Sequence, residues 1–598
     1  MRQTVRLFLI ATVSLGWFVG GIRSAKPQAE VATPSGGDTP SVPHQVLLIN
    51  RQIQQGWEDR GLKPSRPATS GQWCRRVYLD LIGRVPTVEE LHLFLADRAS
   101  ERRTTLVNRL LGDEYREEFS RHWSTIWTNL LIGRTGGTTD ESLASRTGME
   151  QYLRRSFQKS KPYDHLVEEL IVATGSCRPG DEDFNGAANF LADKMEEGGI
   201  QATAKTAQIF LGMAVQCTQC HNHPFNEYRQ NQFWELNAFF RQTLIESLPN
   251  GEDQNVARVY NQDFPGEGRR QHWQSAKEVV WEQIDGEFVD TGAIGRAAAS
   301  IYYELRNGKV KTAFPVFVDG TSLESLQSEA GNKFGNSGYL EHVNRRQELA
   351  KLILDSPEMS RALVNRMWSH FFGYGFTKPI DDRGPHNPPT HPELLEQLGD
   401  SFQQASYDLT ELMRWIVLSK PYGLSSRMTR SNKSDDPTLG IPPMFSHFYM
   451  RQMQAEQLYE TLLIVTSVEE TLAYDDRARS KQRWLDQFNT AFGTDENDES
   501  TTFNGSIPQV LMMMNGDLMA QATGTKPGSF LARVASNHKL SNPEKIRHLY
   551  LAAMSRKPSR EELALSNQLL SARGGNVVEA LQDIWWALLN SNEFVLNH

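Results

Sequence analysis

Arg84-Val-Pro-Thr-Val-Glu-Glu-Leu91 is the stretch that most clearly predicts how this chain folds. Thr87 is a residue type that caps helices. Glu90, three residues later, completes a capping box, in which each of the two side chains binds the other residue's backbone N–H. A helix is therefore expected to begin directly after Thr87. The segment nearly recurs as Arg556-Lys-Pro-Ser-Arg-Glu-Glu-Leu563, and a shared way of starting a helix explains that similarity as well as a duplication does.

Helical periodicity extends over most of the remaining chain, with apolar residues recurring at the spacing of one helix face. Further helices are expected at 104–111, 117–131, 149–158, 164–173, 202–215, 231–240, 345–354, 361–372, 391–404, 409–418, 456–466 and 577–591. Between residues 250 and 335 the pattern changes to short alternating stretches separated by glycine-containing turns, which predicts a small β-rich module. The predicted fold class is mainly α and multi-domain, with helical N-terminal and C-terminal domains on either side of this module.

The N-terminus has the features of a secretory signal peptide. Arg2 and Arg6 precede an apolar run over residues 7–20. That run is shorter than the about 20 residues of a membrane span. No comparable run follows, so we expect an exported protein in the periplasm or at the cell surface, with no transmembrane span beyond the signal sequence. The expected organisation is a signal peptide at 1–25, a flexible linker at 26–44, a helical domain at 45–245, the β-rich module at 250–335 and a helical C-terminal domain at 340–598.

The composition is that of a globular chain and excludes several classes of protein. Of the 598 residues, 39% are hydrophobic and 23% are charged, so most of the chain is not disordered. The net charge of -9 is dispersed and no basic stripe occurs, so no nucleic-acid partner is expected. Four cysteines are too few for a disulfide scaffold, although Cys74 and Cys177 could pair.

Cys217-Thr-Gln-Cys220-His221 is the one motif that specifies a chemistry. Two thiols at this spacing can each add to a vinyl group of one porphyrin, and the adjacent imidazole can then bind the iron as an axial ligand. The motif therefore predicts one covalently attached haem c, held by Cys217 and Cys220 with His221 as the iron ligand. Haem attachment takes place outside the cytoplasm, which agrees with the predicted signal peptide.

Two other chemistries remain open at the motif. Zinc favours a tetrahedral set of thiolates and imidazoles, which Cys217, Cys220, His221 and His223 could supply, although four ligands so close in sequence strain the backbone. A disulfide between the two cysteines is the third alternative, because C-x-x-C is a typical redox pair. If haem is bound, His223 lies too near His221 in sequence to reach the opposite face of the porphyrin. It is then expected to bond a propionate or to cap the turn.

A second polar cluster lies between predicted helices in a loop rich in proline and glycine. Its candidate residues are Asp381, Asp382, His386 and His391. Paired carboxylates with histidines can hold a metal ion or carry out acid–base chemistry. The alternative is structural, with these carboxylates capping helices and pairing with Arg366. No G-x-S-x-G, P-loop or H-E-x-x-H motif occurs, so the sequence assigns no standard enzymatic activity.

Several strings of the chain are long enough to be specific, at 75–87, 210–225, 362–376, 381–382, 387–394, 512–516 and 586–594. Through these strings the chain resembles a large family of exported planctomycete proteins. The family joins a cytochrome-like domain of unknown function to a second, planctomycete-specific domain of unknown function. The resemblance extends from residue 45 to residue 597, and it implies the architecture more specifically than the biochemical role. Many relatives have aspartate where this chain has Asn226.

These observations favour a haem c protein that takes part in electron transfer or redox sensing with a partner protein. A second hypothesis is a metal-dependent or haem-dependent enzyme acting on extracellular polymers, which would be favoured if the loop at 381–391 lay within reach of His221. A third is a structural or surface-interaction protein in which zinc or a disulfide staples the turn. Substrate, redox partner and oligomeric state are not set by the sequence.

Overall fold

The structure is a computed structural model. It describes residues 42–138, 142–250, 254–262, 281–284, 287–290, 301–329, 343–466 and 516–598. The predicted signal peptide and most of the predicted linker lie outside these residues. The cysteine motif at 217–221 and the polar loop at 381–391 both lie within the described residues.

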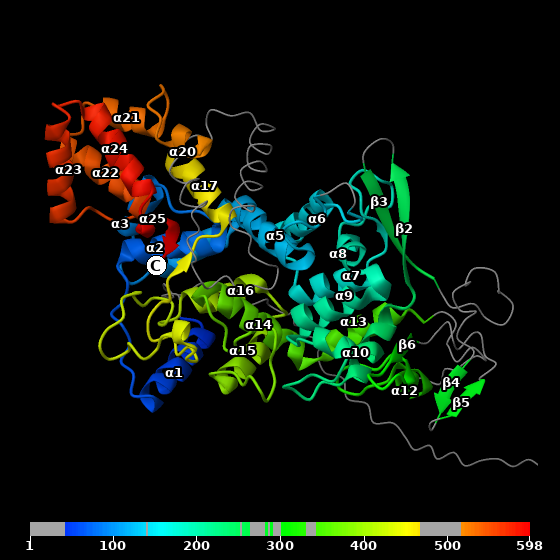
Figure 1. Ribbon diagram of the computed structural model, residues 1–598. Helices are drawn as coiled ribbons and strands as arrows, with labels where there is room; N and C mark the ends of the chain where they lie inside the picture. The colour runs from blue at the N-terminus through cyan, green and yellow to red at the C-terminus, as the bar shows by residue number, and fades with distance from the viewer. Residues whose placement is uncertain are drawn as a thin grey trace, which may run out of the picture. The chain divides into compact units, whose positions relative to one another are not determined.

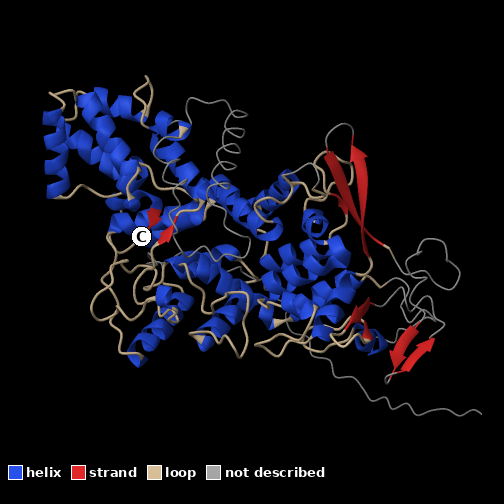
Figure 2. Cartoon of the chain, in the orientation of Figure 1, coloured by secondary structure: helices blue, strands red, loops and turns tan. Residues whose placement is uncertain are grey.

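The fold is mainly helical, as the sequence predicts (Figures 1 and 2). The helices of the first half are α1 (His44–Asp59), α2 (Ser70–Ile82), α3 (Val88–Ala96), α4 (Arg102–Leu110), α5 (Arg116–Ile132), α6 (Arg146–Gln158), α7 (Tyr163–Val172), α8 (Ala188–Lys194), α9 (Glu196–Thr206) and α10 (Gln230–Asn237). Those of the second half are α12 (Leu323–Glu329), α13 (Arg345–Asp355), α14 (Pro357–Phe372), α15 (Pro392–Gln404), α16 (Leu409–Val417), α17 (Ala455–Thr466), α20 (Asp517–Ala522), α21 (Phe530–Ser536), α22 (Asn542–Met554), α23 (Arg560–Ala572), α24 (Val577–Leu589) and α25 (Asn592–Val595).

The described strands form small antiparallel sheets, and most of them lie between the helices of the two halves. Their bounds are β1 (Gly175–Ser176), β2 (Thr243–Asn250), β3 (Gln254–Asn261), β4 (Trp281–Ile284), β5 (Glu287–Asp290), β6 (Ile301–Glu304), β7 (Val310–Ala313), β8 (Arg451–Gln452) and β9 (Leu596–Asn597). The first sheet has the order β1-β3-β2, and the others are the pairs β4-β5, β6-β7 and β8-β9. The predicted β-rich segment therefore contains β3 to β7 among its described residues.

The helix starts test the capping predictions. Thr87 and Glu90 form the predicted capping box at the start of α3. The Asp408 carboxylate caps α16 by accepting from two backbone N–H groups. At the start of α15, His391 is the N-cap and makes no side-chain capping bond.

Two hydrophobic cores hold the described elements together. The larger core runs from Val46 to Tyr449 and includes side chains from both halves of the chain. The smaller core runs from Met453 to Phe594, and Leu79 from α2 packs into it. Apolar burial contributes roughly 25 cal/mol for each Å² removed from water, so these contacts bind the C-terminal helices to the first domain.

The sequence similarity between residues 84–91 and 556–563 corresponds to a repeated three-dimensional unit. In both copies a helix ends in a left-handed residue, Gly83 after α2 and Ser555 after α22, and a capping box opens the next helix. In both copies an arginine follows the left-handed residue and lies over a tyrosine six positions earlier. The similarity therefore extends over a helix–turn–helix unit, which favours an internal duplication over a shared helix start alone.

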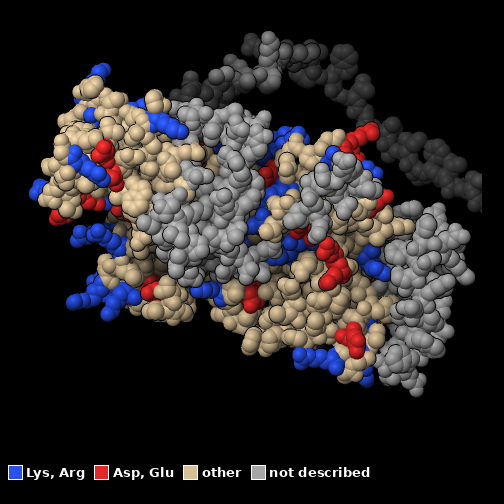
Figure 3. Space-filling view, turned by 45° about the horizontal axis from the view of Figure 1, so that its top comes forward, with Lys and Arg blue, Asp and Glu red and all other residues tan. Residues whose placement is uncertain are grey.

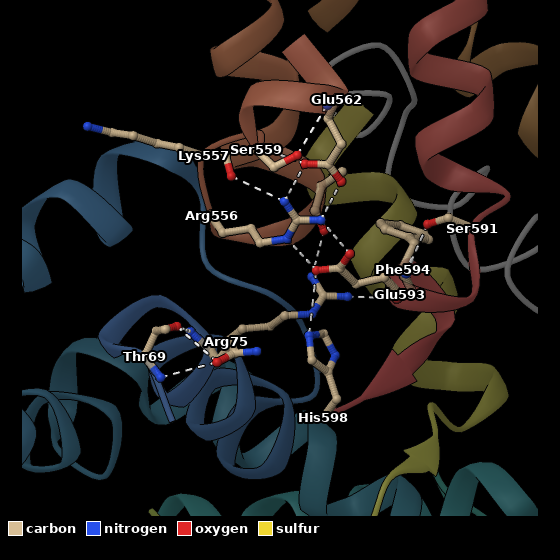
Figure 4. A network of polar contacts seen from close by, with 12 residues as sticks. Thr69, Arg75, Arg556, Lys557, Ser559, Glu562, Ser591, Glu593, Phe594 and His598 are labelled. Carbon is tan, nitrogen blue, oxygen red and sulfur yellow. Dashed lines mark hydrogen bonds and ion pairs between the residues drawn. The ribbon is translucent and has the colours of Figure 1, made fainter. Parts of the chain in front are cut away.

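The arginine of each unit binds two glutamates in the same way, and Figure 4 shows the contacts of Arg556. Arg556 places Nη1 and Nη2 each 2.8 Å from the capping-box Glu562, and Nε 2.6 Å from Glu593. Arg84 places Nη1 and Nη2 each 2.8 Å from Glu90, and Nε 2.6 Å from Glu118. Such bidentate pairs fix both geometry and charge.

Replacing these two arginines by methionine is expected to have unequal effects on stability. The Arg84 side chain is 5% exposed and that of Arg556 is 28% exposed. Removing one partner of a buried ion pair costs about 3 kcal/mol. A solvated pair contributes about 1 kcal/mol or less. Urea unfolding of Arg84→Met and Arg556→Met measures both values, and equal losses would contradict the assignment of the difference to burial.

Charged side chains do not separate by sign on the face drawn in Figure 3, where basic and acidic groups are interspersed. Within the described ranges, no helix is both long and apolar enough to cross a membrane.

Candidate functional site

The cysteine motif lies just past the end of a helix. After α9 the chain makes a π-helical turn at Ala207–Leu211, and Gly212 then adopts a left-handed conformation with φ 67°. The helix expected over 202–215 therefore ends early, because glycine accepts this conformation and because the Arg383 N–H donates to the Gly212 carbonyl at 3.1 Å. The first part of the motif lies in a 3-10 turn at Gln216–Gln219, Cys220 is the C-cap of that turn, and His221 follows it.

The motif turn is held from inside, and its thiols face outward. The buried Thr218 hydroxyl donates to the Val215 carbonyl at 2.5 Å. The Gln219 carbonyl accepts from the indole N–H of Trp234 at 3.0 Å and from the amide of Gln230 at 3.2 Å. Cys217 and Cys220 are both exposed free thiols. The arrangement is a fixed turn that presents two reactive sulfurs to solvent.

The His221 ring has a defined hydrogen-bonding state. Its Nδ1 lies 2.7 Å from the Asn222 carbonyl oxygen, and because that oxygen can only accept, Nδ1 carries the proton. The lone pair of the neutral ring is therefore on Nε2. An imidazole that ligates a metal commonly donates its other N–H to a carbonyl in this way. The contact with Asn222 therefore leaves Nε2 of the neutral His221 ring as its free acceptor.

His223 is in the opposite tautomeric state. Its Nδ1 accepts the backbone N–H groups of Phe225 at 3.2 Å and Asn226 at 3.1 Å. Neutral His223 therefore carries its proton on Nε2 and caps the turn, which is one of the two roles the sequence predicts for it. Burial is the main cause that lowers the pKa of His223, which favours this neutral form.

The structure brings half of the second polar cluster to this turn. The His386 Nε2 lies 3.0 Å from the Asp382 carboxylate, and the His386 and His223 rings lie 6.0 Å apart between centroids. The Tyr228 hydroxyl also donates to the Arg383 carbonyl at 3.5 Å. The loop at 381–386 therefore lies within reach of the motif turn, through His223 and Tyr228.

The other two residues of that cluster lie elsewhere. Asp381 forms an ion pair with Arg366, which was the structural alternative for this cluster. His391 is buried, with its ring 6.0 Å from that of Phe376 and 5.9 Å from that of Phe445. Burial lowers the pKa of His391 to about 4. His391 therefore belongs to the core.

Three further residues take part in the site. Asn226 accepts the Tyr228 N–H at 2.9 Å and so closes the turn that His223 caps. Arg383 forms an ion pair with Glu358, and burial lowers the Arg383 pKa to about 10. Phe225 is 79% exposed. The string His-Asn-His-Pro-Phe after the second cysteine was the available signal for Phe225, whereas nothing local indicated that Arg383 would meet this turn.

The structure also bears on metal and thiol chemistry. Among the described residues, no group of three or more His, Cys, Asp or Glu side chains is arranged to hold a metal ion. Cys74 and Cys177 are buried free thiols, and burial raises the pKa of each. Neither is paired with the other.

Two described cavities lie away from the motif. The larger, of about 450 Å³, lies between α3, α17, α21 and α22 and has Phe530, Arg533 and His548 in its lining. The smaller, of about 20 Å³, lies beside His122 and Glu456. No residue of the motif turn lines either one, so the thiols stand at the surface and not at the mouth of these cavities.

Comparison with known families places the two halves of the site in different domains. Residues 48–244 match a family described as PSCyt2, a protein of unknown function (DUF1549). Residues 345–502 match a second family described as PSD1, a protein of unknown function (DUF1553). No curated protein and no solved structure matches the chain. The chain thus carries two domains of unknown function in tandem, with the cysteine motif in the first and Asp382 and His386 in the second.

Proposed function

We propose that this protein attaches one haem c through Cys217 and Cys220, with His221 as an axial ligand, and that it acts outside the cytoplasm in electron transfer or redox sensing with a partner protein. The observation that carries the proposal is the His221 tautomer. Its Nδ1–H is donated to a carbonyl and its Nε2 is left as the acceptor, directly beside two exposed thiols. The predicted signal peptide supports the location.

The residues of the turn fit the chemistry of attachment. Each thiol S–H adds across one vinyl double bond, so that a C–S bond forms and the hydrogen goes to the neighbouring vinyl carbon. No group leaves and no oxidant is needed. Haem supplies a one-electron couple when bound. The chain's own residues hold the two sulfurs on a turn fixed by Thr218 and Trp234, orient His221, and place Phe225 at the surface nearby.

The test is a pyridine haemochrome spectrum on full-length protein purified from a host with an active cytochrome c maturation system. A c-type spectrum that survives acid–acetone extraction is expected, with one haem per chain. The matched control is Cys217→Ala/Cys220→Ala, in which extraction should remove all haem. Folded, exported wild-type protein that carries no haem would overturn the proposal, and metal analysis with thiol counting would then separate zinc from a disulfide.

A second candidate is a haem-dependent or metal-dependent enzyme acting on extracellular polymers. It is favoured by one observation, the approach of Asp382 and His386 to the motif turn, because a carboxylate–imidazole pair beside a redox centre can exchange protons with a substrate. Release of soluble fragments from a panel of polymers by wild-type protein, with loss of release in Asp382→Asn, would support it. Release that Asp382→Asn leaves unchanged would count against it.

A further inference from the structure

The loop that carries Asp382 and His386 is fixed by side chains on both sides of it. Asn365 in α14 donates to the Ile380 carbonyl at 2.9 Å. Asn387 donates to the carbonyl of Asp382 at 2.8 Å. These bonds hold the loop before it meets any ligand, which is the property of a scaffolded site.

The fixed loop contacts the motif turn at both ends of that turn. Upstream of the motif, the Arg383 N–H donates to the Gly212 carbonyl, at the point where the helix ends. Downstream, the Arg383 carbonyl accepts from Tyr228, and the His386 ring packs against that of His223. The second domain therefore brackets the segment that contains the two cysteines and His221.

Several polar atoms between the two segments are buried and lack a hydrogen-bond partner. They are the Asp382 Oδ1, both ring nitrogens of His386 and the Asn226 Nδ2. The Asp382 and His386 side chains are 17% and 16% exposed, and the His386 Nε2 lies 3.0 Å from the Asp382 carboxylate without forming a hydrogen bond. A buried polar group without a partner costs about 1–3 kcal/mol. Such a cluster is poorly explained by stability alone and points to a role at the site.

We propose that Asp382 and His386 are positioning residues for the haem site, so that the two domains together build one functional unit. Asp382 orients the His386 ring, the ring supports His223, and His223 holds the turn that follows His221. The inference rests on the proposed haem attachment for its spectroscopic readouts. Its structural core, that the second domain orders the motif turn, can be tested without haem.

The test compares full-length Asp382→Asn and His386→Ala with two matched controls from the same loop. The controls are Asp381→Asn, whose carboxylate pairs with Arg366, and His391→Gln, whose ring lies in the core. Both test variants are expected to lose at least half of the covalent haem per folded chain and to show a shifted reduction potential. His386→Gln, which keeps a polar side chain beside Asp382, should recover part of the loss relative to His386→Ala. Wild-type haem content and potential in both test variants would overturn the proposal.

Amide hydrogen exchange separates the two proposals. In a haem-free Cys217→Ala/Cys220→Ala background, His386→Ala should increase exchange over residues 216–228 about tenfold, whereas His391→Gln should leave exchange there unchanged. If wild-type protein carries no haem, the proposed function fails while this measurement still decides the positioning role. Unchanged exchange over 216–228 would overturn that role. Unfolding midpoints of every variant exclude global unfolding as the cause.

Discussion

Replacing Asp80 by alanine is expected to lower the free energy of unfolding by about 3–5 kcal/mol. The Asp80 side chain is fully buried in α2, where it accepts from the Tyr422 hydroxyl at 2.7 Å and the Asn597 amide at 2.7 Å. It also forms an ion pair with Arg451. Without the carboxylate, the largely buried guanidinium of Arg451 loses its counter-charge, and that loss is the main cost.

Urea unfolding followed by circular dichroism measures this effect. The matched control is Asp113→Ala, because the Asp113 side chain is fully exposed and its loss should change stability by less than about 0.5 kcal/mol. In Asp80→Leu/Arg451→Leu both charges are absent, so part of the stability lost in Asp80→Ala should return. A loss below about 1 kcal/mol in Asp80→Ala would contradict the account of a costly buried charge.

Asp80 also shows where sequence-based reasoning ends. The next helix begins at the Thr87 capping box, which depends on neighbouring residues and is predicted from the sequence, whereas the helix that carries Asp80 is not among the predicted helices. The partners of its carboxylate come from positions 422, 451 and 597. No local pattern encodes such pairings, because tertiary packing alone determines which distant polar groups share a buried position.

Part of the candidate site is likewise predictable from the sequence, and part of it depends on tertiary packing. The cysteine motif is predictable because haem attachment needs two thiols and an imidazole at a fixed local spacing. The sequence identifies the second cluster as polar residues in a loop, but it does not predict which of them lie near the motif. Asp382 and His386, four residues apart, lie together against His223, whereas Asp381 pairs with Arg366 and His391 enters the core. Which of these side chains lies near the motif depends on the direction in which each one leaves the turn, and the composition of the loop does not determine that direction.

Stability is expected to fall as the pH is lowered from about 6.5 to about 4, because two histidines whose pKa values lie near 4 remain neutral in the folded protein. Burial lowers the pKa of His370 to about 4, and a nearby Arg451 adds to the effect while Asp80 opposes it. Burial lowers the pKa of His391 to about 4 as well, with Arg60 acting in the same direction. The unfolded chain binds these protons near the ordinary pKa of about 6.5, so acid favours unfolding.

The sign and size of the effect follow from that difference. The contribution of these two histidines to the free energy of unfolding is fully present above about pH 6.5. It is lost as the pH falls, by up to about 3 kcal/mol for each histidine once pH 4 is reached. Urea unfolding at a series of pH values above 5 measures the slope before most carboxylates are protonated. His391→Gln removes one of the two groups and should reduce the slope by roughly half of their joint contribution. A slope that His391→Gln leaves unchanged would show that this histidine is already protonated in the folded state, and would contradict its assignment to the dry core.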